Sequence, residues 1–393
     1  MKTENSYLLH LLGAYLREEE PEICPDVNWK NLLDLSVIHN VVGILGYMSM
    51  RYPICPEPEI AATLRSSCKA TVAIFTRRSF QAQQLMQALE NAGIDHIVMK
   101  GSVLRDLYPV PELRTFNDID LVIRPDNREQ CDRLMLSQGY LRKDDWEPVY
   151  SYFQSDLLLE VHTDIMEIDV SDRADYRGYF RRMWEYVQQV RPHSYRFTPE
   201  FHFLYLLTHI AKHVHGAGAG VRMYLDIAAF IHHYGEGLDW AWLREQLVQL
   251  KLEQFANVVL TAANTWFGVS CPIDYPAANP SVMEQFTFYT LEAGTFGHQN
   301  RDAALAELKH SAPGTSGNKA RQLLQKVFPS AKSIQNRYTY LQDKPWLLPA
   351  AWVHRLVKNR HKVGMETEKM HSILKADNEA VRSLQQLMKN IGL

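Results

Sequence analysis

The 393-residue sequence has few cysteines and no long apolar run. Its five cysteines are scattered and form no C-x-x-C pair, which argues against a disulfide framework or a zinc cage and favours reduced thiols. No apolar run approaches the length of a membrane span. The first twenty residues carry acids and are typical of an amphipathic helix, not of a secretory signal. We therefore expect a cytoplasmic protein with no membrane span. The cysteines are Cys24, Cys55, Cys68, Cys131 and Cys271.

The sequence also lacks an excess of charge of either sign. With 42 Lys and Arg against 45 Asp and Glu, the formal net charge is −3, so no global field favours nucleic acid or membranes. The 46% hydrophobic and 22% charged content is ordinary for a globular protein. There is no internal repeat or low-complexity tract. The length accommodates roughly two or three domains.

Hydrophobic periodicity divides the chain into helical and mixed regions. Residues 5–92 are predominantly helical, with Asn28 as a helix cap and a helix from about 77 to 91 that directs Phe80, Leu85, Met86 and Leu89 toward a core. Strands and short helices follow, and helices return from about residue 200. We predict an α+β fold in which a small mixed-sheet core is flanked by N-terminal and C-terminal helical regions. The expected strands are 94–99, 118–123, 149–153 and 157–162; the expected helices are 102–107, 125–136, 200–215, 221–234, 240–250 and 252–267. The expected domains are 1–92 (helical), 93–190 (the α/β core), 191–270 (helical, beside the core) and 271–393 (helical).

Two segments of the core have the composition of a phosphate and metal site. Gly101 and Ser102 follow Lys100 where a strand turns into a helix, so backbone N–H groups and the helix N-terminus would face phosphate oxygens. Asp118 and Asp120 are two apart on a strand, so both carboxylates project from one face and form a cradle for Mg²⁺ on a triphosphate. A lone Asp-x-Asp is often a solvated turn or a helix cap. Here the pair interrupts a buried strand, where charges are costly unless a metal or partner compensates them.

A third acid lies on the predicted strand 157–162. Leu158, Glu160 and His162 share one face of this strand, while Leu157 and its alternate neighbours share the other. If the strand lies beside 118–123, Glu160 completes a three-carboxylate set with Asp118 and Asp120, and it is also placed to act as general base. A surface ion pair is the alternative for Glu160. His162 is expected to orient Glu160, to touch substrate or to be a satisfied histidine.

The ordered combination of these segments resembles the DNA polymerase β-type nucleotidyltransferase superfamily. More narrowly, the chain looks like an uncharacterised bacterial nucleotidyltransferase family with Lys-Gly, Arg-x-x-x-Asp-Ile-Asp-Leu and acid-x-His segments. The helical segment from Asn28 to Met48 is also similar to the lead-in of that family. The resemblance covers roughly residues 28–230, and its matching pieces are Lys100-Gly101, Arg114 to Leu121 and Glu160-Val161-His162.

The resemblance implies a metal-dependent transfer of a nucleoside monophosphate from an NTP to a hydroxyl acceptor, with release of pyrophosphate. Asp118, Asp120 and Glu160 would be the catalytic and metal-binding residues, with Glu160 in place of the superfamily's usual aspartate. The metal would be Mg²⁺ or Mn²⁺, and the NTP is expected to be ATP. Gly101 and Ser102 would hold the β- and γ-phosphates. Lys100 and Arg114 would neutralise phosphate charge, or each would pair with a nearby acid.

The helices after the core carry a second dense group of polar residues. His209 and His213 are i,i+4, as are Arg222 and Asp226 on the next predicted helix. We expect Arg222 and Asp226 to line the nucleotide or acceptor cleft, together with Lys212 and His213. The alternatives are a surface Arg222–Asp226 pair and a metal site of His209, His213 and Asp226.

Residues 321–363 are basic and interleaved with aromatic side chains such as Trp346 and Trp352. Such a segment is typical of a solvated helix face, but it also suits RNA or another polyanionic acceptor. Three functions stay open: transfer to a small molecule, peptide or protein; modification of RNA or tRNA; and nucleotide binding by a catalytically reduced regulatory protein.

Overall fold

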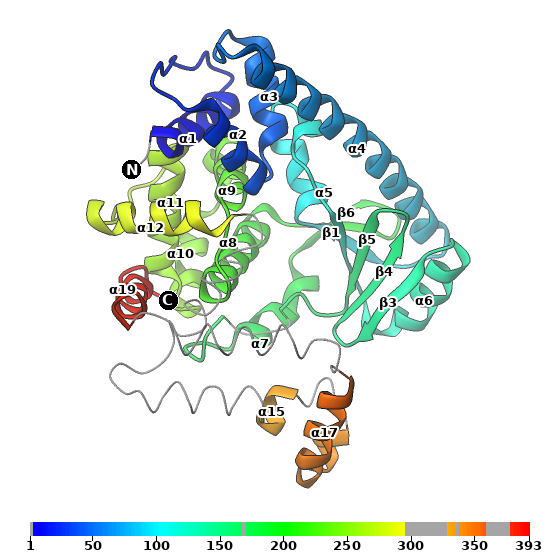
Figure 1. The fold of residues 1–393 in the computed structure, drawn as a ribbon. Coiled ribbons are helices and arrows are strands. Elements are labelled where there is room, and N and C mark those ends of the chain that lie inside the picture. The colour runs from blue at the N-terminus through cyan, green and yellow to red at the C-terminus, as the bar shows by residue number, and fades with distance from the viewer. Residues whose placement is uncertain (1–2, 167–169, 295–327, 335–337, 339, 359–377) are drawn as a thin grey trace.

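The computed structural model describes six parts of the chain, and they form a helical half beside a β-sheet half (Figure 1). The described residues are 3–166, 170–294, 328–334, 338, 340–358 and 378–393. The long helix α4 (Pro58–Asn91) runs along the outside of the molecule from the helical half to the far end of the sheet (Figure 1). The predicted α+β class is confirmed.

Seven strands of the described chain form one mixed sheet in the order β3-β4-β5-β2-β1-β7-β6. The central strand β2 runs antiparallel to β1 and parallel to β5, and β1 runs parallel to β7. The remaining neighbours are antiparallel pairs. The strands are β1 (His96–Met99), β2 (Asp118–Ile123), β3 (Leu141–Trp146), β4 (Val149–Gln154), β5 (Leu157–His162), β6 (Val187–Arg191) and β7 (Ser194–Phe197).

The helices before and within the sheet region are α1 (Thr3–Leu16), α2 (Trp29–Ile38), α3 (Val42–Arg51), α4, α5 (Gly101–Leu104), α6 (Arg128–Ser137) and α7 (Tyr176–Phe180). Those after it are α8 (Pro199–His215), α9 (Val221–Tyr234), α10 (Trp240–Gln249), α11 (Glu253–Phe267), α12 (Pro280–Ala293), α15 (Ala331–Ile334), α16 (Tyr340–Asp343), α17 (Leu348–Lys358) and α19 (Asn378–Asn390). The Asn28 side chain caps α2 by accepting a hydrogen bond from the Asn31 N–H, as the sequence predicts.

The two faces of the sheet pack against different helices because side chains alternate along each strand. On one face, Ile119 and Leu121 of β2 form a core with Leu85 and Leu89 of α4 and with side chains of α6. On the other face, Val122 and the alternate residues of β1 join the large core built by α1, α8, α9 and α11. Asp118 and Asp120 alternate with Ile119 and Leu121, so they lie on the face toward the helical half.

The structure corrects several expectations. Phe80 is 61% exposed and not in the core, because it lies five residues, or roughly 140° around the helix, from Leu85. The helix that carries it begins at Pro58, far before residue 77. The sequence analysis missed α7, β3 and the β6–β7 hairpin. β6 is largely exposed and lacks an apolar alternation.

One expectation concerns a region that the structure describes only in part. The basic region 321–363 is described only at 328–334, 338 and 340–358, where Trp346 is 73% exposed and Trp352 donates a hydrogen bond to the Pro329 carbonyl. The remainder of that region lies outside the described residues.

No described helix has both the length and the apolar character to cross a membrane.

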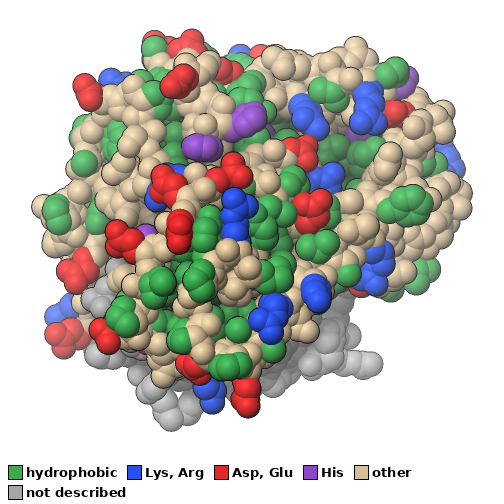
Figure 2. Space-filling model, turned by 90° about the horizontal axis from the view of Figure 1, so that it is seen from above, with side chains coloured by type: hydrophobic (Ala, Val, Ile, Leu, Met, Phe, Trp, Pro, Cys, Tyr) green, Lys and Arg blue, Asp and Glu red, His purple; other side chains and the backbone are tan. Residues whose placement is uncertain are grey.

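Acidic and basic side chains are both spread over the face drawn in Figure 2, and neither sign covers it. This distribution agrees with the formal net charge of −3. The surface on this side therefore has no broad field of one sign to attract a polyanion.

Candidate active site

Parallel pairing of β2 with β5 brings the acids of the two strands side by side. Asp120 is the register partner of Glu160, Asp118 of Leu158 and Val122 of His162. Register partners in adjacent strands point to the same face of a sheet. The strand that the sequence assigned to Glu160 thus lies directly beside the Asp-x-Asp strand, as predicted.

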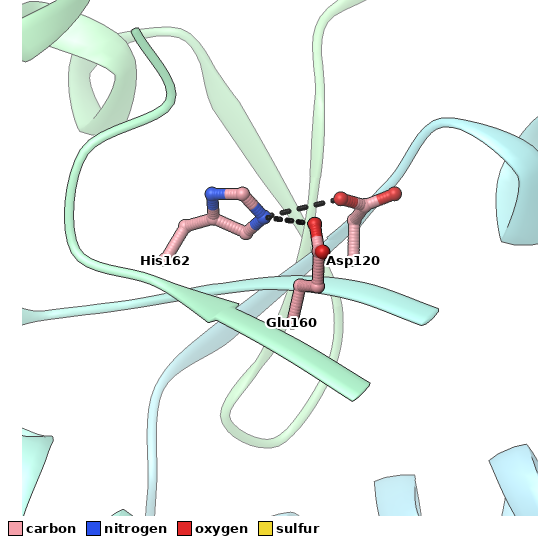
Figure 3. A group of neighbouring side chains, drawn as sticks. All are labelled: Asp120, Glu160 and His162. Carbon is pink, nitrogen blue, oxygen red and sulfur yellow. Dashed lines mark hydrogen bonds and ion pairs between the residues drawn. The ribbon is translucent and has the colours of Figure 1, made fainter. Parts of the chain in front are cut away.

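Asp120, Glu160 and His162 form a group that can hold a metal ion. Each offers one ligand atom, and these atoms lie within 4.8 Å of one another. Figure 3 shows the imidazole directed at both carboxylates: Nε2 of His162 is 3.1 Å from Oδ1 of Asp120 and 3.8 Å from Oε2 of Glu160. His162 rather than Asp118 is therefore the third member of this group. The alternation along β5 predicts the shared face of Glu160 and His162, whereas the third metal ligand expected from the sequence is Asp118, which stays a prediction.

Lys100 neutralises Asp120 at the turn after β1. Its Nζ lies 2.7 Å from Oδ1 of Asp120, and the Asp120 side chain is 3% exposed. Burial lowers the pKa of Lys100, but the charge of Asp120 outweighs it and the pKa is raised overall. Lys100 adopts φ +54°, a strained conformation for a residue with a Cβ. Lys100 therefore pairs with a nearby acid, which is one of the two contacts predicted for it.

The carboxyl groups of Asp118, Asp120 and Glu160 differ in pKa because burial and neighbouring charges act on them differently. Burial raises the pKa of Asp120, but Lys100 and His162 outweigh it and hold that pKa well below its usual range. The pKa values of Asp118 and Glu160 are raised, first by burial and then by the nearby Asp120 charge. Carboxylates that differ in this way within one cluster are candidates for proton transfer and metal binding.

Gly101 and Ser102 begin the helix α5, which has four residues. A Cβ at Gly101 would lie 2.7 Å from Nη1 of Arg114 and 3.2 Å from Cβ of Phe116, so glycine permits the close packing of Arg114. The Ser102 hydroxyl oxygen is buried without a hydrogen-bond partner among the described residues. The turn therefore lies beside Asp120 with one buried polar oxygen left unsatisfied.

Arg114 and Asp226 form a buried, two-pronged ion pair between the sheet and α9. Nε and Nη2 of Arg114 donate to the two carboxylate oxygens of Asp226 at 2.9 and 2.7 Å, and the Tyr108 hydroxyl donates to Oδ1 at 2.7 Å. Arg114 is 7% and Asp226 is 5% exposed. The alternative of a surface pair between Arg222 and Asp226 is wrong, because Asp226 is buried and faces Arg114. The sequence analysis missed Tyr108, and no local pattern indicates its partner on α9.

Arg222 lies one helical turn before Asp226 and contacts the loop that leads into β2. Its Nη1 donates to Oγ1 and to the carbonyl of Thr115 at 2.8 and 3.2 Å. Burial, followed by the repulsion of Arg114, lowers the pKa of Arg222 to about 10. The Arg222 charge in turn acts to lower the pKa of Asp118.

His209 and His213 on α8 stack edge to face, with their Nε2 atoms 3.1 Å apart. Burial, followed by the charges of His213 and Lys100, lowers the pKa of His209 well below its ordinary value. These imidazoles do not form a three-ligand group with Asp226, whose oxygens bind Arg114 and Tyr108. The alternative metal site of His209, His213 and Asp226 is therefore not present among the described residues.

A family model described as an uncharacterised nucleotidyltransferase matches residues 25–268. The chain belongs to this nucleotidyltransferase family. The match runs from the residues before α2 to the end of α11, so it includes the whole sheet, Lys100, the Asp120–Glu160–His162 group and the Arg114–Asp226 pair. No curated protein and no solved structure matches the chain.

Membership of the nucleotidyltransferase family supports nucleotidyl transfer as the general reaction and a nucleotide as a substrate. The donor set of two carboxylates and one imidazole fits a divalent metal ion. Carboxylate oxygens suit Mg²⁺, and an added imidazole nitrogen also suits Mn²⁺.

Proposed function

We propose that this protein is a Mg²⁺- or Mn²⁺-dependent enzyme that transfers a nucleoside monophosphate from an NTP, with ATP the expected donor, to a hydroxyl acceptor. The observation that carries the proposal is the adjacency of Asp120 and Glu160 across the parallel β2–β5 pair. Rigid carboxylates at that spacing hold a metal ion against a triphosphate.

Asp120, Glu160 and His162 would hold the metal, with Asp118 on the same face of β2. When bound, the ion supplies positive charge to the triphosphate and lowers the pKa of an acceptor hydroxyl near it. Lys100 contacts Asp120 directly and is the cation placed to neutralise phosphate charge. Gly101 and Ser102 follow Lys100 at the start of α5, and we assign their backbone N–H groups to the β- and γ-phosphates.

The acceptor oxygen attacks the α-phosphorus, the bond from that phosphorus to the β-bridging oxygen breaks, and pyrophosphate leaves. The acceptor proton goes to Glu160, whose pKa is raised by burial and by the nearby Asp120 charge. We assign Arg222 to the nucleotide side of the site because it contacts Thr115 in the loop that leads into β2, three residues before Asp118. Arg114 and Asp226 contribute by fixing α9, and with it Arg222, against β2.

The proposal is tested by incubating the full chain with each α-³²P-labelled NTP, Mg²⁺ or Mn²⁺ and a lysate of the source cells, and by asking which fraction becomes labelled. We expect label in one acceptor fraction, with pyrophosphate released. The Glu160→Gln variant should lower the rate by at least about a hundredfold, because several kcal/mol of charge stabilisation are lost. The exposed Glu129→Gln serves as control. Binding of Mg-ATP with no transfer to any fraction would instead favour a regulatory nucleotide-binding protein.

A further inference from the structure

A cavity of about 510 Å³ lies between α4 and the strands β1, β7 and β6. Small-molecule sites have volumes of roughly 300–1,000 Å³. Val98 and Ile119 line the cavity, and they alternate with Met99 and Asp120 along their strands. The cavity is therefore on the opposite face of the sheet from the Asp120–Glu160–His162 group.

One wall of the cavity is apolar and aromatic. Phe75 and Phe80 line it from α4, and Val190 lines it from the β6–β7 hairpin. Phe80 is 61% and Val190 is 49% exposed. Large apolar side chains that stay exposed around one concave surface indicate a binding site for an apolar group.

The other wall carries three arginines and, with them, Glu90 and Glu112, so positive charge prevails there. Arg105, Arg191 and Arg196 reach the cavity from three different segments. Nη2 of Arg196 is 3.7 Å from Asp106, and Nη1 of Arg191 is 3.9 Å from Glu90. Exposed pairs at such separations are weak, so both guanidinium groups remain available to an anion.

The Ser102 hydroxyl of the cavity lining is buried and has no hydrogen-bond partner among the described residues. Buried polar atoms usually have a partner, and a hydroxyl can donate to an anion, so this group indicates a contact that an anionic ligand would satisfy. Ser102 lies on the cavity side of the turn that carries Lys100.

We propose that this cavity binds a small organic anion with a flat aromatic body, at a site separate from the metal-binding group. The ring packs among Phe75, Phe80 and Val190, and the anionic group pairs with Arg191 and Arg196. This assignment does not depend on the proposed transfer reaction.

The test uses 8-anilinonaphthalene-1-sulfonate, an aromatic sulfonate whose fluorescence rises when its rings leave water. Titration into the full chain should show one saturable site. Phe80→Ala and Arg196→Gln should each raise its Kd about tenfold, through loss of aromatic packing and of the charged partner. Both side chains are at least half exposed, so the variants should keep the wild-type melting temperature.

Two variants outside the cavity serve as matched controls. Phe288→Ala removes a phenylalanine with the same 61% exposure, and Arg133→Gln removes an arginine that is 72% exposed. Each should change the Kd by less than about twofold. Wild-type affinity in the two cavity variants, or equal losses in the controls, would place the probe elsewhere and overturn the proposal.

A competition experiment with saturating Mg-ATP tests whether this site is distinct from the nucleotide site. We expect the sulfonate to stay bound when Mg-ATP is present. Competitive displacement would make the cavity the nucleotide pocket itself and would contradict a separate site, whether or not nucleotidyl transfer is observed.

Discussion

Asp120 is the residue around which the candidate site is arranged. It is buried, contacts Lys100 and His162, and is the register partner of Glu160. Its depressed pKa means that it stays ionised at neutral pH and is a permanent ligand for a cation. Asp118, two residues earlier, lies on the same face but outside the three-ligand group.

The first prediction concerns metal affinity. His162→Gln should weaken Mn²⁺ binding by about 10–100-fold and Mg²⁺ binding less, because Mg²⁺ prefers oxygen ligands. Glu160→Gln should weaken both ions. Titration calorimetry of the full chain measures these affinities, with Glu129→Gln, an 88% exposed acid, as control. Equal Mn²⁺ affinity in wild type and His162→Gln would remove His162 from the metal site.

The second prediction concerns the buried Arg114–Asp226 pair. Asp226→Asn should lower the free energy of unfolding by about 3–5 kcal/mol, because it leaves the Arg114 charge buried and uncompensated. Glu185→Gln breaks an exposed pair with Arg182 and should cost at most about 1 kcal/mol. Urea denaturation of the three proteins measures the difference. A cost for Asp226→Asn as small as that of the control would contradict the structural role of the pair.

Features that depend on residues close together in the sequence could be predicted, whereas contacts between residues far apart in the sequence could not. Alternation along a strand correctly placed Asp118 and Asp120 on one face of β2, and Glu160 and His162 on one face of β5. The ion pair between Arg114 and Asp226 joins residues 112 positions apart, and no local periodicity encodes such a contact. The sequence offers the neighbour Arg222 as one alternative partner of Asp226, and the structure shows Arg114 in its place.

At the scale of elements, the parallel β2–β5 pair brings the acidic residues of the site together, and helices of the helical half pack against the same face of the sheet. The strands 149–153 and 157–162 are both expected from the sequence, and their antiparallel pairing brings β5 beside β2. The full length of α4 was not predicted. Of its 34 residues, only five are buried, so its apolar stripe is too sparse to mark one continuous helix.

His39 provides the third prediction, because it joins three helices. At the end of α2, its Nε2 lies 3.1 Å from the carbonyl of Leu291 in α12, and its Nδ1 accepts the Val221 N–H of α9 at 3.4 Å. These contacts define a neutral imidazole, since Nδ1 must accept and Nε2 must donate. Burial lowers the pKa of His39 to about 4.

The sign of the pH effect follows from that lowered pKa. The unfolded chain binds a proton at His39 near pH 6.5, whereas the folded chain does so only near pH 4, so stability falls as the pH falls through this window. The loss attributable to His39 is on the order of 3 kcal/mol. His39→Gln keeps a donor and an acceptor but does not titrate, so its unfolding free energy should fall less between pH 7 and pH 4. Urea denaturation across this range checks it, with the exposed His233→Gln as control. Equal acid sensitivity of His39→Gln and wild type would contradict the neutral-imidazole assignment.

At the scale of the whole molecule, the near-neutral charge favours a small acceptor over RNA. An RNA acceptor held through 6–10 phosphates would lose about 10³–10⁵ in affinity between 50 and 200 mM salt. We predict that the apparent affinity for the labelled acceptor changes by less than about tenfold over this range. Titration of the acceptor fraction at the two salt concentrations measures this, and digestion of the fraction with ribonuclease is the control. A steep salt dependence that disappears with ribonuclease would favour the RNA alternative, with 321–363 as its expected surface.

The proposed reaction is transfer of the nucleoside monophosphate, with its α-phosphorus, at the Asp120–Glu160 site. Its most direct test compares ATP labelled at the α-phosphate with ATP labelled at the γ-phosphate, in the presence of Mn²⁺ or Mg²⁺ and the acceptor fraction. The wild-type protein should transfer label from the α position only and release one pyrophosphate per transfer, and both Glu160→Gln and Asp120→Asn should abolish it. Acceptor labelled from the γ-phosphate, or α-label transferred equally well by Glu160→Gln, would contradict the account.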